Sequence, residues 1–127
     1  MGYNGLKGDY AKETFENAAS AIFKEHEEIS YLSIVDDTVK IIAQKGFLEV
    51  HPSKLEKFHI QALLMAKVCD VSSESFGMLQ QVCASFNDKY EVVVIPLSKR
   101  LCAIAVLTHA SHGRAEQVGK DIKARLK

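Results

Sequence analysis

Residues 78–107 read MLQQVCASFNDKYEVVVIPLSKRLCAIAVL, and this stretch decides how the chain folds. It holds three apolar segments joined by two short polar breaks, Asn87–Lys89 and Ser98–Arg100. Segments rich in valine and isoleucine that are joined this tightly run antiparallel, so they predict a three-stranded meander. Val92–Ile95 and Leu101–Leu107 are apolar at nearly every position, which is typical of strands covered on both faces. The rest of the chain must therefore supply helices to both sides of a sheet.

The first strand of the meander, Met78–Asn87, differs from the other two because it is half polar. One side carries Met78, Gln80, Val82, Ala84 and Phe86, and the other carries Leu79, Gln81, Cys83, Ser85 and Asn87. Such a strand lies at the edge of a sheet or at an interface, and an open edge must be covered or paired. Pro96 removes a donor at the end of the second strand, so we expect pairing to be limited there.

Upstream, the hydrophobic pattern predicts a helix followed by a hairpin. Apolar residues between residues 11 and 29 fall on one helical stripe, with glutamates and lysines opposite. Two short β-prone runs, Tyr31–Val35 and Val39–Gln44, flank the turn Asp36–Thr38, which contains no glycine or asparagine for a positive φ. Residues 1–10 hold three glycines and no periodic pattern, which predicts a flexible tail. We therefore expect a single domain over residues 11–127.

The helix predicted over Pro52–Cys69 has an unusually wide apolar arc. One stripe is enough to cover a sheet, and His59, Ile60 and Leu64 widen the arc beyond that need. A second apolar stripe meets either a partner subunit or the neighbouring loops, and the sequence leaves both readings open. A last helix over His112–Lys127 completes the chain.

Together these segments predict an α+β fold in the order α-β-β-α-β-β-β-α, with three α-β-α layers. We expect five antiparallel strands in the spatial order 2-1-5-4-3, with the first and last helices on one face and the middle helix on the other. The first helix is acidic, since residues 12–28 carry five glutamates and two lysines. The last is basic, since residues 113–127 carry five basic and two acidic side chains. Opposite charges favour placing these two helices side by side.

The bulk composition narrows the classes of function. Sixteen basic residues balance sixteen acidic ones, so we expect no general attraction to nucleic acid or to an anionic membrane. Three cysteines without CxxC spacing argue for a reducing compartment. We recognise no secretory signal and no apolar run that approaches a membrane span, and we expect a cytoplasmic protein.

Three local features resemble the roadblock/LC7 family, the dynein-light-chain relatives within the profilin-like folds. They are the hairpin YLSIVDDTVKIIAQKG at residues 31–46, the helix from Pro52 to Cys69, and the strand pair YEVVVIPLSKRLCAIAVLT at residues 90–108. The likeness covers about residues 11–127 and is closest to small archaeal roadblock-like proteins. One departure is Thr38, which stands where the family commonly has a turn glycine.

The resemblance implies a noncatalytic homodimer that pairs through the middle helix and the first meander strand. The interface residues implied in this way are Leu55, Phe58, His59, Ala62, Met65, Leu79, Gln81, Cys83 and Ser85. The resemblance further implies a scaffold for a small Ras-like GTPase, whose nucleotide cycle such a module can tune. It implies no cofactor and no metal.

Two other classes of function compete with this reading. A small-molecule sensor of the PAS or GAF type would need a closed cavity with polar lining. An enzyme with a nucleophile at Cys83 or Cys102 would need a thiol of lowered pKa. His109 and His112 have a spacing that suits a metal, but no third ligand lies near them in the sequence. Neither GxxxxGK[ST] nor GxGxxG occurs, so the chain carries no known nucleotide-hydrolase motif.

Overall fold

The computed structural model describes residues 2–87, 89–98, 100–108 and 112–126, and it describes side chains from residue 13 onward, except that of residue 112. In chain order the elements are α1 (Gly2–Glu25), β1 (Ile29–Asp36), β2 (Ile41–Gly46), α2 (Pro52–Asp70), α3 (Ser73–Phe76), β3 (Val82–Phe86), β4 (Tyr90–Pro96), β5 (Leu101–Thr108) and α4 (His112–Leu126). The predicted histidine pair includes residue 109, which lies outside the described residues. Within the described part of the chain, no helix has both the length and the apolar character needed to cross a bilayer.

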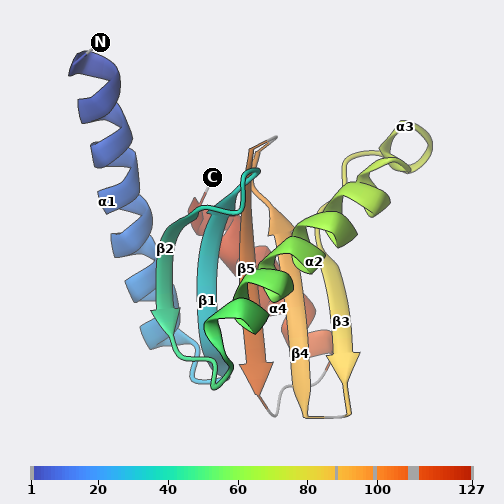
Figure 1. Cartoon of the computed structure of the whole chain (residues 1–127). Coiled ribbons are helices and arrows are strands. Elements are labelled where there is room, and N and C mark those ends of the chain that lie inside the picture. The colour runs from blue at the N-terminus through green and yellow to red at the C-terminus, as the bar shows by residue number, and fades with distance from the viewer. Residues whose placement is uncertain (1, 88, 99, 109–111, 127) are drawn as a thin grey trace.

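The five strands form one antiparallel sheet in the order β2-β1-β5-β4-β3, as predicted (Figure 1). β5 is central and pairs with β1 on one side and with β4 on the other. Its position explains why residues 101–107 are apolar almost throughout, because both faces of β5 are covered and nearly all its residues are buried.

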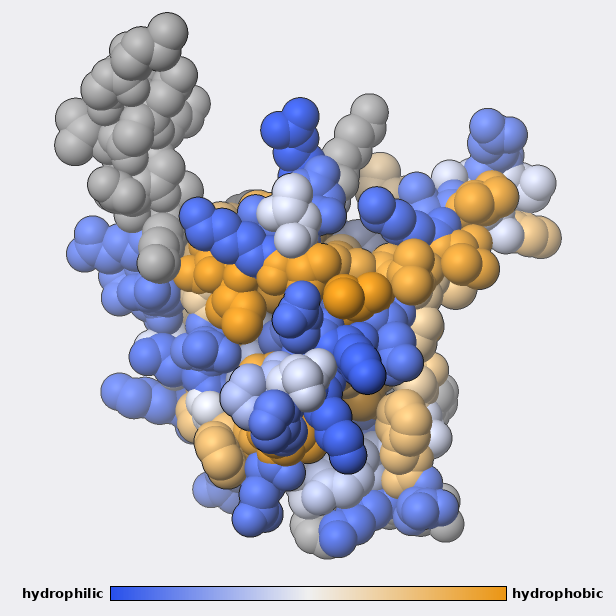
Figure 2. All heavy atoms as spheres, viewed as in Figure 1, coloured by the Kyte–Doolittle hydropathy of each residue, from blue (hydrophilic) through white to orange (hydrophobic). Residues whose placement is uncertain are grey.

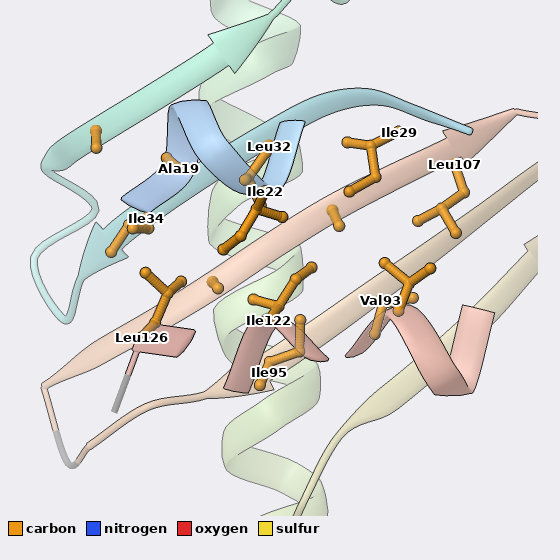
Figure 3. Packing of buried hydrophobic residues seen from close by; sticks show 14 of the residues in the cluster. Ala19, Ile22, Ile29, Leu32, Ile34, Val93, Ile95, Leu107, Ile122 and Leu126 are labelled. Atoms are coloured by element: carbon orange, nitrogen blue, oxygen red, sulfur yellow. The ribbon is translucent and has the colours of Figure 1, made fainter. Parts of the chain in front are cut away.

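Helices cover both faces of the sheet, which confirms the predicted three layers (Figure 1). On one face, Ile22 of α1 and Ile122 of α4 are fully buried in a core with Val93 and Ile95 of β4 (Figure 3). Burying an isoleucine of this kind contributes roughly 1.5–3 kcal/mol. On the other face, α2 packs through a smaller core that includes Ala62.

Ion pairs join α1 and the turn that follows it to α4, which confirms that the acidic first helix lies beside the basic last helix. His26 Nε2 lies 2.7 Å from Asp121 Oδ2, and a guanidinium nitrogen of Arg114 lies 2.9 Å from Glu28 Oε1. Arg125 pairs with Glu25. These contacts connect the beginning and the end of the chain on one face of the sheet.

The first helix differs from its predicted bounds at both ends. Ile29 was expected on the helical stripe, but α1 ends at Glu25 and Ile29 begins β1. The chain turns between them, where the Ile29 amide bonds the His26 carbonyl at 3.1 Å. Residues 2–10, predicted as a flexible tail, have a helical backbone that continues α1 beyond the sheet (Figure 1). A packed helix extends at low cost, because each added residue brings one hydrogen bond.

The first meander strand is shorter than predicted. β3 begins at Val82 instead of residue 78, and its pairing with β4 runs from Val82 opposite Val94 to Phe86 opposite Tyr90. Continuing that register would place residue 80 opposite Pro96, which has no amide to donate. The predicted loss of pairing at Pro96 therefore shortens β3. The loop before this strand contains a short helix, α3, that the sequence did not indicate.

Candidate interaction surface

The outward face of α2 carries a row of exposed apolar side chains. Ile60, Leu64 and Val68 follow one another at intervals of four residues, which aligns them along one side of a helix. Their exposed fractions rise along the helix from 38% to 55% and 70%, and Val71 continues the row at 80%. Figure 2 shows hydrophobic residues gathered along α2 toward α3. These four residues are called the α2 stripe below.

Beyond the α2 stripe, apolar exposure continues onto the segment that leads to the sheet edge. Phe76 in α3 and Met78 after it are 87% and 78% exposed. A shallow hollow of about 270 Å³ lies between them and the end of α2, where Cys69 contributes to the lining. Contiguous exposed apolar surface of this kind indicates a site where another macromolecule binds.

The edge strand β3 adjoins this apolar surface. β3 pairs with β4 on one side, and no strand pairs with its other side within the described part of the chain. The cross-strand partners Phe86 and Tyr90, at the end of β3 and the start of β4, are both exposed. An unpaired edge beside exposed apolar side chains offers a partner both backbone hydrogen bonds and hydrophobic contact.

The structure separates the interface residues predicted on α2 into two groups. His59 and Ala62 are buried against the sheet, at 1% and 3% exposure, which places them in the core of this chain. Leu55, Phe58 and Met65 are half-buried along the sides of the helix. Their contact with a partner stays a prediction.

The residues predicted on and before the first meander strand are also divided, because β3 begins at Val82 and Leu79, which precedes it, does not follow the alternation of the strand. Leu79 packs with the core under α2. Cys83 packs with the core under α1 and α4, and the Gln81 amide donates to the Glu116 carbonyl of α4 at 3.3 Å. Ser85 donates a hydrogen bond to Glu91 in β4. Gln81 and Cys83 therefore do not lie on one surface with α2.

Sequence reasoning identified Ile60 and Leu64 as residues that widen the apolar arc, but it did not single out the rest of the exposed row. The four-residue spacing through Val68 was the signal that could have found it. Phe76 and Met78 carried no comparable signal, because they lie in a polar loop and at a strand start whose exposure depends on the tertiary structure.

A buried polar cluster fixes the inner face of α2. His59 Nε2 lies 3.1 Å from Ser33 Oγ and 3.3 Å from the Tyr31 hydroxyl, and that hydroxyl donates to Gln44 Oε1 at 3.0 Å. Burial lowers the pKa of His59 and raises the pKa of Tyr31. Ser33 is fully buried, so the serine–histidine pair is closed to a substrate and acts as a structural contact.

The thiols that a cysteine nucleophile would require have pKa values shifted in the unfavourable direction. Burial raises the pKa of Cys83, and the carboxylates of Glu91 and Glu116 raise it further. Burial also raises the pKa of Cys102. A nucleophilic cysteine needs the opposite shift, so neither residue matches that chemistry.

Neither of the two main hollows among the described residues has the form that a small-molecule sensor needs. A second hollow, of about 180 Å³ between α4 and the segment before β3, is lined by Gln80, Gln81, Lys120 and Lys123. Both hollows are smaller than the clefts of about 300–1,000 Å³ that enclose small ligands. Neither lies between the sheet and α2, where a sensor of the PAS or GAF type would hold its ligand.

Comparison with solved structures identifies the fold. A roadblock/LC7 domain from Streptomyces avermitilis superposes with a TM-score of 0.69 at 10% identity, covering 87% of this chain and 90% of that one. The gliding protein MglB from Thermus thermophilus gives 0.71 at 15% identity, with coverages of 91% and 87%. A profilin from Schizosaccharomyces pombe gives 0.58 at 10% identity, with coverages of 87% and 94%. No protein-family model and no curated protein sequence matches the chain.

Proposed function

We propose that this chain, whose fold is that of roadblock/LC7 domains and profilins, is a noncatalytic interaction module that pairs with a second copy of itself. The observation that carries the proposal is the α2 stripe beside the unpaired edge of β3. Two copies related by a twofold axis would join their β3 edges and cover their stripes with each other. The MglB structures include a tetrameric arrangement, which supports self-association as a use of this fold.

The chemistry of the stripe favours an apolar partner surface. Its four side chains are aliphatic, and a second copy supplies the same aliphatic row at the same distance from its own β3. A twofold interface is self-complementary when a surface of this kind meets itself. Removing these side chains from water contributes about 25 cal/mol for each Å² buried, so one charge placed at the centre should dissociate the pair.

Leu64 is the position to test, because it is 55% exposed and lies in the middle of the row. We expect the wild-type chain to sediment as a dimer at tens of micromolar, and Leu64→Glu to sediment as a monomer with its circular dichroism unchanged. Gln117→Glu is the matched control, since Gln117 is exposed on α4, which covers the opposite face of the sheet. A wild-type chain that is monomeric at this concentration would refute self-association.

A second step concerns the partner of the dimer. We propose a small Ras-like GTPase as that partner, with the module acting as scaffold or as modulator of the nucleotide cycle. The support is the resemblance of residues 31–46, Pro52–Cys69 and residues 90–108 to the roadblock family. Wild-type protein and Leu64→Glu should be used as paired baits in extracts of the source organism. Capture of a GTPase by the wild type, and a changed rate of GTP hydrolysis on adding the protein, are the expected results.

A further inference from the structure

The inner face of α2 carries a titratable group at the point where the helix meets the sheet. His59 is 1% exposed, and its Nε2 contacts the hydroxyls of Ser33 and Tyr31, which are themselves 0% and 2% exposed. The other buried residues of α2 are Ala62, Leu63 and Ala66. Among the described residues, His59 is therefore the one buried polar side chain through which α2 is attached to the sheet.

The described neighbours of His59 suit a neutral imidazole and include no group that balances a charge. β1 contributes Tyr31 and Ser33, and β2 contributes Gln44 through the tyrosine hydroxyl. The core on this side of the sheet is otherwise apolar, with the protonated thiol of Cys102 as its titratable member. On α2 itself, the centroid of the Phe58 ring lies 5.6 Å from that of the imidazole. Lys67, two turns further along the helix, lowers the pKa of Cys102 through its charge.

None of these described neighbours is a carboxylate. A proton on His59 would place a positive charge among hydroxyl dipoles and hydrocarbon, and burying an unpaired charge is costly. When α2 leaves the sheet, the imidazole reaches water and takes up the proton freely. Protonation therefore favours the state in which α2 is detached.

We propose that His59 makes the attachment of α2 to the sheet depend on pH. Acidification then detaches α2 from the sheet and displaces the α2 stripe, through which the proposed dimer forms. The consequence for the dimer rests on the proposed function, whereas the release of α2 rests on the buried cluster alone. The sign follows from linkage. Burial lowers the pKa of His59 below its ordinary value of 6.5, so the detached state binds a proton that the attached state does not. Attachment is complete above that value and weakens as pH falls below it.

Hydrogen exchange of the α2 amides measures the attachment directly. Protection factors, corrected for intrinsic exchange, should be compared between α2 and β4 at about pH 7.5 and about pH 5.5, on either side of the ordinary histidine pKa. We expect the ratio of α2 to β4 protection to fall in the wild type, by at most about tenfold for each pH unit. In His59→Gln, which keeps an amide acceptor but does not titrate, the ratio should stay constant.

A second histidine on the same helix provides the control. His51 is the N-cap of α2, and its Nδ1 accepts from the Ser53 amide at 3.2 Å. His51→Asn keeps a capping oxygen and removes the imidazole. This variant should show the same loss of α2 protection as the wild type. If the loss disappears in His51→Asn, the cap is the sensor and the inference about His59 is overturned.

Two further readouts keep the inference testable if His59→Gln does not fold. Ring nitrogen shifts in the wild-type protein report the protonation of His59, which should coincide with the loss of α2 protection. A protonated His59 in a fully protected α2 overturns the inference. Sedimentation at both pH values separates the two proposals: a chain that is monomeric at both refutes the dimer, while the protection ratio still decides the role of His59.

Discussion

At the scale of single residues, the backbone at Gly46 allows no side chain. Gly46 has a φ of 84°, in the left-handed region that favours glycine. A Cβ at this position would overlap the carbonyl oxygen of Ser30 and lie 2.8 Å from the ring of Phe23. The amide of Phe47 bonds that same carbonyl at 3.1 Å. Gly46 thus lets the end of β2 pack closely on the start of β1.

We predict that Gly46→Ala lowers the free energy of unfolding by more than about 2 kcal/mol, since the left-handed conformation alone costs about 1–2 kcal/mol and the backbone contact must also open. Urea unfolding followed by circular dichroism measures this. Gly113→Ala is the control, because an added Cβ there meets nothing within 4 Å. Because Gly113 lies in a helix, Gly113→Ala should leave the free energy of unfolding unchanged or raise it by up to about 1 kcal/mol. Equal effects of the two substitutions would contradict this explanation of Gly46.

The turn between β1 and β2 shows where residue-level prediction stopped. Aspartate was expected to bond nearby amides, and Asp36 Oδ1 accepts from the amides of Thr38 and Lys40, each at 2.9 Å. The turn has no glycine to take a positive φ, and the sequence does not indicate which residue replaces it. In the structure Val39 takes the positive φ, at 68°. A β-branched residue is disfavoured at a positive φ, so backbone propensity does not predict Val39 at this position. The side-chain bonds of Asp36 hold the turn in this conformation.

At the scale of elements, charged and polar side chains at the protein surface join α4 to the end of α1. The hydrogen bond from His26 lowers the pKa of Asp121 most strongly, and Arg125 lowers it further. A lowered carboxylate pKa stabilises the folded state above the ordinary value of 3.8. This contribution is lost as pH falls through the folded value. Because the Asp121 side chain is 33% exposed, solvent screening keeps the contribution small.

Asp121→Asn should therefore cost about 0.5–1 kcal/mol of unfolding free energy at neutral pH, the range of partly exposed ion pairs. The difference from the wild type should shrink as pH falls below 3.8 and through the lowered pKa of Asp121, because the protonated carboxyl is then neutral like the amide. Urea unfolding at neutral pH and at acid pH tests this. Asp37→Asn, at an exposed position in the β1–β2 turn, should have little effect at either pH. A cost that is independent of pH would assign Asp121 a steric role.

Elements were predicted well where periodicity and burial coincide. The runs that became β4 and β5 are apolar because both of their faces are covered, so their sequence carried the signal. β3 carried a weaker signal, and its start at Val82 depends on the register against Pro96. The residues of the interaction surface were harder still to predict from the sequence. Which of His59 and Ile60 faces the sheet depends on the rotation of α2 about its axis, and a wide apolar arc does not specify that rotation.

At the scale of the whole molecule, the two faces of the sheet are covered unequally. One face has two helices joined to each other by ion pairs, whereas the other, in the described part of the chain, is covered by α2, which has an aliphatic row still facing water (Figures 1 and 2). A second copy laid over α2 would give this face a second helix too. In the proposed dimer both faces of each sheet would be covered by two helices, and the stability of the fold would be a property of two chains.

We therefore predict that the thermal midpoint rises with protein concentration. A dimer that unfolds to two separate chains gains stability from mass action. With an unfolding enthalpy of about 0.7 kcal/mol per residue, a hundredfold increase in concentration should raise the midpoint by about 5 °C. Leu64→Glu should remove this dependence, because the charge lies where the second copy packs. Gln117→Glu should retain it, since the charge lies on α4, on the opposite face of the sheet. A wild-type midpoint that stays constant over the same range would contradict the pairing of α2 with a second copy of this chain.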